Sequence, residues 1–589
     1  MQLKQLFRDE LAYLKLQGKE FSQQNPSLSR FLSDESTDPD VERLLEGFAF
    51  LSARLRQKIE DDFPELTHSM LNLLWPNYLR PIPSTTIIQF SPVDGSITKK
   101  QTLSKHQIVH SQPVDGTCCQ FRCCHQIPIY PLQLDAIDCT ESRENSVIGL
   151  DFTTLSNIPF NETGCDHIPV FISEDDYTAQ TLYLWIFHYL DQIKVITSDD
   201  HITMLPASFI KPIGFSAKEA LLPYPNNAFD GYRVLQEYLA NPERFYFFDI
   251  TGLEAIWPTS AIENIRIELC FNRPLPEDIK VRKSSFKLYC TPAVNLFEHD
   301  AEAIGFTGKS TEYPVKPAGQ NHEHYEIFSI NQVSGWLPKH SEHNKKSRIY
   351  KAFESFEHEE ASVMKQPSLF FQSRIQRSMS DSSFNHFIRF VREDETLISV
   401  EDRETISIEM TCSNRNLPNA LAIGDINVKT TNTPSFLTFK NITRPTESIR
   451  PILDESLHWK LISNMSINYH TLLKPAPLKN LIQSYDFRAA VDQNAQRHSQ
   501  QRLLGIQDIN TQPMDHFIHG LPIRGIQSNL YLDPEYYACE GEMFLFGTVL
   551  SHFFSLFSSI NSFHKLNVIN TSNKEIYTWP LQLSNQRHI

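Results

Sequence analysis

Glycine is scarce in this chain, with 19 residues among 589. A typical globular protein has about 7% glycine, so several glycine-rich cofactor loops are not expected here. The sequence contains no Gly-x-Gly-x-x-Gly loop, Gly-x-Ser-x-Gly elbow or His-Glu-x-x-His helix, the patterns that mark dinucleotide, hydrolase and zinc-protease sites. We therefore expect no cofactor, and no residue stands out as catalytic, cofactor-binding or metal-binding.

Basic charge is also in deficit, because 54 Lys and Arg face 70 Asp and Glu and give a net charge of −16. Such a surface repels nucleic acid and anionic lipid, so we expect no nucleic acid as a partner. The sequence contains no run of about 18 apolar residues, the length needed to span a bilayer. The first 21 residues carry charges of both signs, whereas a signal peptide has an uninterrupted apolar segment. The ten cysteines show no secreted disulfide framework. We expect a cytoplasmic protein with no direct membrane insertion.

Two amphipathic helices are predicted near the start of the chain. Apolar residues recur at steps of three or four residues in the first, among them Leu3, Phe7, Leu11 and Leu14. The second begins with Asp38 as N-cap and Pro39 at its first position. Its apolar face comprises Val41, Leu44, Leu45, Phe48, Leu51, Leu55 and Ile59.

Gly47 interrupts this second helix and costs about 1 kcal/mol relative to alanine. Either the helix tolerates it, or another backbone approaches closely at that point. A third helix opens at Pro64. Together the three helices predict a bundle that another chain completes, although the apolar stripes would equally fill this chain's own core.

Beyond residue 84, short apolar runs between turns replace the helical spacing. They predict strands at Thr86–Phe90, Val170–Ile172, Thr181–Leu190, Gln192–Ile196, Ile265–Phe271, Phe286–Cys290, His386–Val391, Glu404–Cys412 and Leu566–Ile569. Helical spacing returns at Gly231–Ala240 and from Phe546 to Ile560.

The predicted fold class is α+β, with an N-terminal helical bundle segment, β-rich middle domains and a mixed α/β C-terminal region. The expected divisions are residues 1–83 (helical), 84–338 (β-rich with helical insertions), 339–385 (a polar loop or junction) and 386–589 (mixed α/β).

A phosphate-binding loop is weakly suggested by Ala303–Ser310, which has Ala in place of the first glycine of a P-loop. The preceding residues are acidic, and Pro314 prevents a helix from continuing after the segment. We therefore interpret it as an exposed turn, and keep a nucleotide-binding enzyme as the alternative function.

Two clusters could hold a metal. Cys118, Cys119, Cys123, Cys124 and His125 are close in sequence, but adjacent residues of a strand point to opposite faces. Buried cysteines are the favoured interpretation, with structural zinc as the alternative. His322 and His324 would share one face of a strand, but no third ligand is identifiable.

A family resemblance comes from longer segments. The run Asp38–Leu51, continuing into Asp62–Thr67, with Tyr78–Ser84, strongly resembles the N-terminal signature of the TssF family, also called VasA or ImpG, of type VI secretion baseplate subunits. Later segments agree in order: Tyr232–Tyr238, Phe245–Asp249, Cys290–Asp300, Thr311–Val315, Phe546–Leu550, Ser559–Phe563 and Trp579–Pro580.

The resemblance implies a structural role without catalysis: a wedge subunit of the baseplate, in which two copies associate with one TssG. That complex would join TssE and TssK around the VgrG spike hub, support sheath assembly, and dock at the inner membrane through the membrane complex. We expect Leu3, Phe7, Leu11, Leu14, Phe48, Leu51, Leu55 and Ile59 to form the interface with TssG and the second copy.

Overall fold

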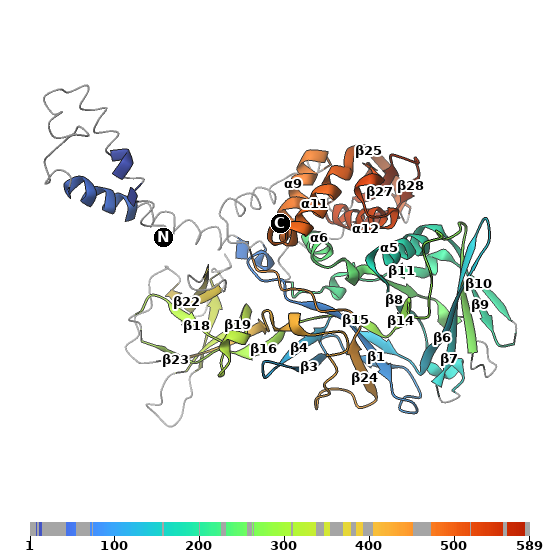
Figure 1. Cartoon of the computed structure of the whole chain (residues 1–589), viewed down its shortest axis with the longest axis horizontal. Coiled ribbons are helices and arrows are strands. Elements are labelled where there is room, and N and C mark those ends of the chain that lie inside the picture. The colour runs from blue at the N-terminus through green and yellow to red at the C-terminus, as the bar shows by residue number, and fades with distance from the viewer. Residues whose placement is uncertain are drawn as a thin grey trace, which may run out of the picture.

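The structure is a computed structural model (Figure 1). It describes residues 7–8, 11–14, 43–54, 71–72, 75–155, 158–199, 201–224, 231–255, 262, 264–307, 310–336, 347–353, 369–377, 384–392, 404–451, 473–518, 520–557 and 562–583. Its parts are a central body of three sheets, a sheet-rich inserted unit and a C-terminal unit of helices and strands. The helical residues 7–8, 11–14 and 43–54 lie away from these parts (Figure 1).

Two five-stranded antiparallel sheets form most of the body. The first has the order β24 (Leu437–Asn441), β1 (Thr85–Pro92), β15 (Cys290–Val294), β4 (Thr117–Cys123) and β3 (Ile108–Val114). The second has the order β10 (Ile202–Pro206), β9 (Leu190–Thr197), β13 (Asn264–Phe271), β7 (Ser146–Thr154) and β6 (Leu132–Glu141). Buried residues alternate with more exposed ones along β4 and β9, as in a half-buried sheet, whereas β15 is buried on both faces.

A four-stranded sheet packs beside them, in the order β11 (Ile210–Pro212), β12 (Phe247–Ile250), β8 (Ile168–Ile172) and β14 (Phe286–Leu288). A short pair, β2 (Gln101–Leu103) and β5 (Ile127–Ile129), completes the body's strands in the described chain. Its helices are α4 (Phe160–Thr163), α5 (Asp176–Leu184), the π-helix η4 (Trp185–Tyr189) and α6 (Gly231–Ala240). Asp175 caps α5 by accepting a hydrogen bond from the backbone N–H of Thr178.

The inserted unit leaves the body after β15 and returns before β24. Its sheet has the order β16 (Phe297–Asp300), β23 (Glu404–Ser413), β19 (Glu326–Trp336), β20 (Ser347–Ala352), β21 (Leu369–Arg377), β22 (Phe384–Arg392) and β18 (Tyr313–Val315), with β17 (Ile304–Phe306) also on β23. Fourteen buried residues, from Phe297 to Cys412, make a core of its own. This unit is therefore packed separately from the body.

The C-terminal unit combines helices α9 (Pro475–Tyr485), α10 (Phe487–Val491), α11 (Gln493–Gly505) and α12 (Glu540–Phe557) with a small sheet. That sheet runs β25 (Ile506–Ile518), β26 (Leu521–Leu532), β27 (Phe563–Asn570) and β28 (Ile576–Thr578), with β29 (Gln582–Leu583) on β27. Its apolar residues belong to the same core as those of the body.

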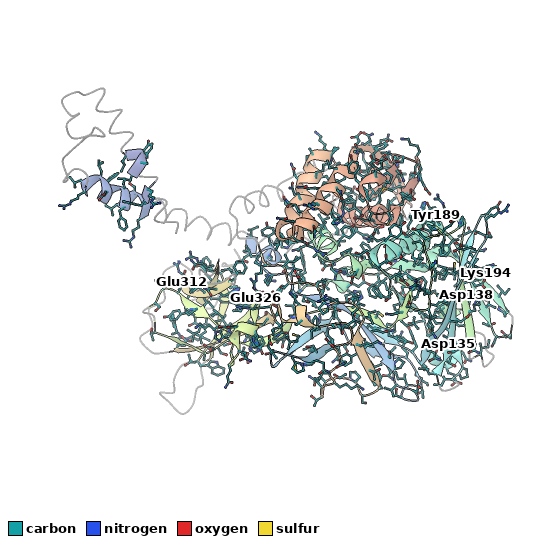
Figure 2. The ribbon with its side chains drawn as sticks, in the orientation of Figure 1. Asp135, Asp138, Tyr189, Lys194, Glu312 and Glu326 are labelled. Atoms are coloured by element: carbon teal, nitrogen blue, oxygen red, sulfur yellow. The ribbon has the colours of Figure 1, made fainter. Side chains whose placement is uncertain are left out.

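A polar contact also joins the C-terminal unit to the body. Tyr189, labelled in Figure 2, ends η4, and its hydroxyl donates to Oε1 of Glu575 at 2.6 Å. Arg273 donates to both partners, to the Tyr189 hydroxyl and to Oε2 of Glu575. The C-terminal unit is thus fixed to the second sheet by packing and by hydrogen bonds.

The predicted fold class is wrong, because strands dominate the described chain and it contains no N-terminal helical bundle. Within residues 1–83 the described α-helical residues are 7–8, 11–14, 43–54 and 71–72. Four large apolar side chains of residues 43–54, Leu44, Phe48, Phe50 and Leu51, are exposed instead of packed in a bundle. The apolar spacing identified a helix and its apolar face, but spacing alone does not say whether another helix covers that face.

Single elements were predicted more successfully. The helix at Gly231–Ala240 is α6, and the described part of Phe546–Ile560 lies in α12. Thr181–Leu190 was predicted as a strand and is wrong, since Thr181–Tyr189 is helical, in α5 and η4. Almost every side chain of this run is buried. The sequence therefore lacks the polar face that would show a helical repeat of 3.6 residues.

Candidate partner interface

The helical residues 43–54 expose an apolar stripe. Leu44, Phe48 and Leu51 are 74%, 60% and 59% exposed, respectively. Their spacing of four and then three residues places them on one face of the helix. Large apolar side chains that cluster on a monomer's surface commonly mark an interaction site.

The same helix buries small residues instead. Ala49 and Ala53, four residues apart, have no exposed surface. In Figure 1 this helix lies away from the body and the inserted unit. Phe48 and Leu51 therefore do not fill this chain's own core, which was the alternative interpretation of the stripe.

The other predicted interface residues are placed only in part. Phe7, Leu11 and Leu14 are half-buried, whereas Leu3, Leu55 and Ile59 lie outside the described residues. Leu44 was recognised on the apolar face but omitted from the predicted interface. Its position four residues before Phe48 would have identified it.

The P-loop-like segment is part of a sheet. Ile304–Phe306 form β17, paired antiparallel with β23, and Gly308 and Lys309 lie outside the described residues. The described residues 310–315 contain no helix and lead into β18. A P-loop needs a helix N-terminus directly after its loop to hold phosphate, so this geometry does not favour nucleotide binding.

The cysteine cluster lies on β4 and just beyond it. Cys118 is exposed and Cys119 buried, so this pair points to opposite faces of β4 as predicted, whereas Cys123 at the end of the strand and Cys124 beyond it are both buried. Burial raises the pKa of Cys119 and Cys124 to about 11 and lowers the pKa of His125 to about 3. At neutral pH these buried thiols are protonated, as expected of cysteines that pack as small apolar side chains.

The two histidines occupy a different element from the predicted strand. His322–His324 form a 3₁₀ helix, η9. His324 Nδ1 lies 2.8 Å from the Thr117 hydroxyl. Over the described residues, no three His, Cys, Asp or Glu side chains are grouped to hold a metal ion.

Comparisons with known proteins give the class of this chain. A family model described as "Type VI secretion system, TssF" matches residues 1–586. The chain is 26% identical to the type VI secretion system component TssF1 of Pseudomonas aeruginosa, over 98% of each chain.

Two solved structures contain chains whose fold is similar to that of this protein. A chain in the cryo-electron microscopy structure of the type VI secretion system TssK-TssF-TssG baseplate subcomplex superposes with a TM-score of 0.78 and 26% identity, covering 93% of this chain and 99% of that chain. A chain of the baseplate complex from the type VI secretion system has a similar fold, with a TM-score of 0.61 and 24% identity, covering 99% of this chain and 100% of that one.

The class is thus a component of a type VI secretion system. The chain belongs to the TssF family, so the resemblance noted in the sequence is confirmed. None of the helices that the structure describes is long and apolar enough to cross a membrane.

Proposed function

We propose that this chain is a structural subunit of a type VI secretion baseplate that works by holding neighbouring proteins in place, without catalysis. The exposed stripe of Leu44, Phe48 and Leu51 carries the proposal. A soluble monomer gains nothing from three large apolar side chains in water, whereas an assembly subunit can bury them against a partner.

TssG and TssK are the proposed direct partners, because a chain of similar fold was solved as part of the TssK-TssF-TssG baseplate subcomplex. In finer detail, two copies of this chain would associate with one TssG, and the wedge would join TssE around the VgrG spike hub. The subunit would act in the cytoplasm, docked at the inner membrane through the baseplate and the membrane complex.

The energetics require more than the stripe alone. Each fully buried large apolar side chain contributes about 1.5–3 kcal/mol, and association costs about 4–15 kcal/mol. Three side chains only begin to offset that cost. Five or six would hold a permanent complex, which is why Phe7, Leu11 and Leu14 belong to the proposed interface.

Co-expression with TssG and TssK, followed by native mass spectrometry, tests the proposal. The double variant Phe48→Ala/Leu51→Ala should no longer co-purify with TssG. Its melting temperature alone should barely change, because substitutions at exposed positions alter stability by about 0.5 kcal/mol or less.

Glu46→Ala is the matched control, since Glu46 is exposed on the same helix and outside the stripe. It should leave the complex intact. If the double variant still forms the complex, this interface is wrong. If the unmodified chain binds neither TssG nor TssK, the proposed function is wrong.

A further inference from the structure

A cleft of about 350 Å³ lies in the body where β1, β6 and β14 meet. These strands belong to three different sheets and lie close together in the lower right of Figure 1. The volume falls within the range of small-ligand sites, about 300–1,000 Å³. The half-buried apolar residues Pro92, Leu134 and Leu155 line part of it, whereas Phe90 and Phe286 beside it are almost fully buried in the core.

Tyr289 forms a strained wall of this cleft. Its φ of 57° lies in the left-handed region, which a bulky side chain rarely adopts. The buried hydroxyl donates to the backbone carbonyls of Tyr130 and Leu132, at 3.0 and 2.9 Å. Such strain persists only where the surroundings enforce it, and it concentrates at functional sites. These contacts fix the conformation of Tyr289 at the wall of the cleft.

Positive charge gathers at the cleft in a chain that is acidic as a whole. Lys283 and Lys287 line it, and Lys440 of β24 pairs in register with Gln89 on its wall. Among the described residues, none of these three ammonium groups lies within ion-pair distance of a carboxylate.

The electrostatics at Lys287 agree with this arrangement. Burial is the main cause that lowers its pKa, and the like charge of Lys440 lowers it further, whereas Cys290 and, less strongly, Glu174 oppose the shift. Asp94 is the one acidic residue in the cleft lining. Apolar walls with convergent ammonium and amide groups suit a ligand that is apolar with one anionic end.

We propose that this cleft binds a carboxylate carried on an apolar body, with the carboxylate between Lys283 and Lys287 and the apolar part against the half-buried Leu134 and Leu155. The carboxylate belongs either to an acidic, partly apolar segment of a protein neighbour or to a free apolar acid. The exposed Gln133 supplies an amide group at the rim for a hydrogen bond, and the Gln89 amide beside it donates to the carbonyl of Leu288 at 3.5 Å. This site is separate from the N-terminal stripe and does not depend on the proposed function.

Fluorine NMR with the purified full chain tests the chemistry. The probe is 4-fluorophenylacetate, and its neutral isostere 4-fluorophenylacetamide is the matched control. We expect the signal of the acid to broaden on adding protein and that of the amide to stay sharp. Lys287→Gln and Lys283→Gln should each weaken binding of the acid at least tenfold, and the double variant should abolish it.

Lys99→Gln removes one charge from an exposed lysine outside the cleft and should leave binding unchanged. Equal broadening by acid and amide, or retained binding in the double variant, would overturn the proposal. Displacement of the probe by the peptide acetyl-Leu-Glu-Phe-amide identifies a protein segment as the source, and displacement by hexanoate alone identifies a free acid. If neither displaces it, the ligand class is wrong.

Discussion

Asn295 and Asn414 clasp one another where the inserted unit joins the body. The Asn295 amide donates to Oδ1 of Asn414 at 2.9 Å, and the backbone N–H of Asn414 donates to Oδ1 of Asn295 at 2.6 Å. Both side chains are fully buried. Asn295 also donates to the carbonyl of Gln120 on β4, at 2.7 Å. The clasp thus ties both ends of the unit to the first sheet.

Replacing Asn295 with alanine should loosen this junction. The backbone N–H of Asn414 would stay buried without its acceptor, at a cost of about 1–3 kcal/mol. We expect a lower urea midpoint and earlier proteolytic cleavage between the unit and the body. Asn427→Ala is the control, because its hydrogen bond to Gly424 is exposed and should hardly matter. Equal effects of the two variants would contradict the structural role of the clasp.

His564 should make the C-terminal unit sensitive to acid. It is buried beside the Ser528 hydroxyl, and burial lowers its pKa to about 3. An unfolded histidine has a pKa of about 6.5. Above pH 6.5 both states are neutral and the group contributes nothing. As the pH falls from about 6.5 towards 3, only the unfolded state binds the proton, so stability falls by up to about 1.4 kcal/mol per pH unit.

His564→Gln keeps a hydrogen-bonding side chain but cannot take up that proton. Its urea midpoint should therefore fall less steeply between pH 6.5 and 4.5 than that of the natural chain. Its midpoint at pH 8 measures any packing defect separately, because the proton has no effect there. Parallel curves for the two proteins would show that His564 does not contribute to the acid sensitivity.

Gly541 permits close contact between α12 and α5. A Cβ at this position would lie 2.2 Å from the carbonyl oxygen of Gln180 and 2.7 Å from the backbone nitrogen of Thr181. Backbone atoms cannot turn aside, so Gly541→Ala should destabilise the chain by about 1–3 kcal/mol. Thermal melting would detect this, and an unchanged melting temperature would contradict the contact.

Gly47→Ala is the contrasting substitution, because nothing lies within 4 Å of a Cβ there. In the isolated chain it should stabilise the helix by up to about 1 kcal/mol. Loss of TssG binding in this variant would indicate that a partner's backbone approaches Gly47.

Local spacing predicted local elements well. The apolar steps of Gly231–Ala240 and the alternation in Gln192–Ile196 each identify one element. The helix is buried on all sides, but Arg233, Gln236 and Glu237 separate its apolar residues at helical spacing. No pattern within a short window could show that Asn295 meets Asn414, 119 residues away. The clefts and junctions of this chain depend on such distant pairs, which periodicity cannot reveal.

The sequence also predicted part of the candidate interface, namely which residues share an apolar face, but not what that face contacts. Helical spacing placed Phe48 and Leu51 on one apolar face, and the structure shows both on the surface of the helix. Whether that face meets this chain's own core depends on where the rest of the molecule lies. The spacing of the residues carries no such information, and this is the reason that the helical bundle was wrongly predicted.

One more consequence follows from β25, which lies at the edge of the C-terminal sheet. Thirteen residues of edge strand invite another strand to join by hydrogen bonds. Pro513 in the middle of β25 has no N–H to offer, which interrupts any such ladder. This chain is proposed to work beside a second copy of itself. The proline disfavours edge-to-edge pairing of the C-terminal sheets of two copies. The apolar helix of residues 43–54 then remains as the surface for contacts between subunits.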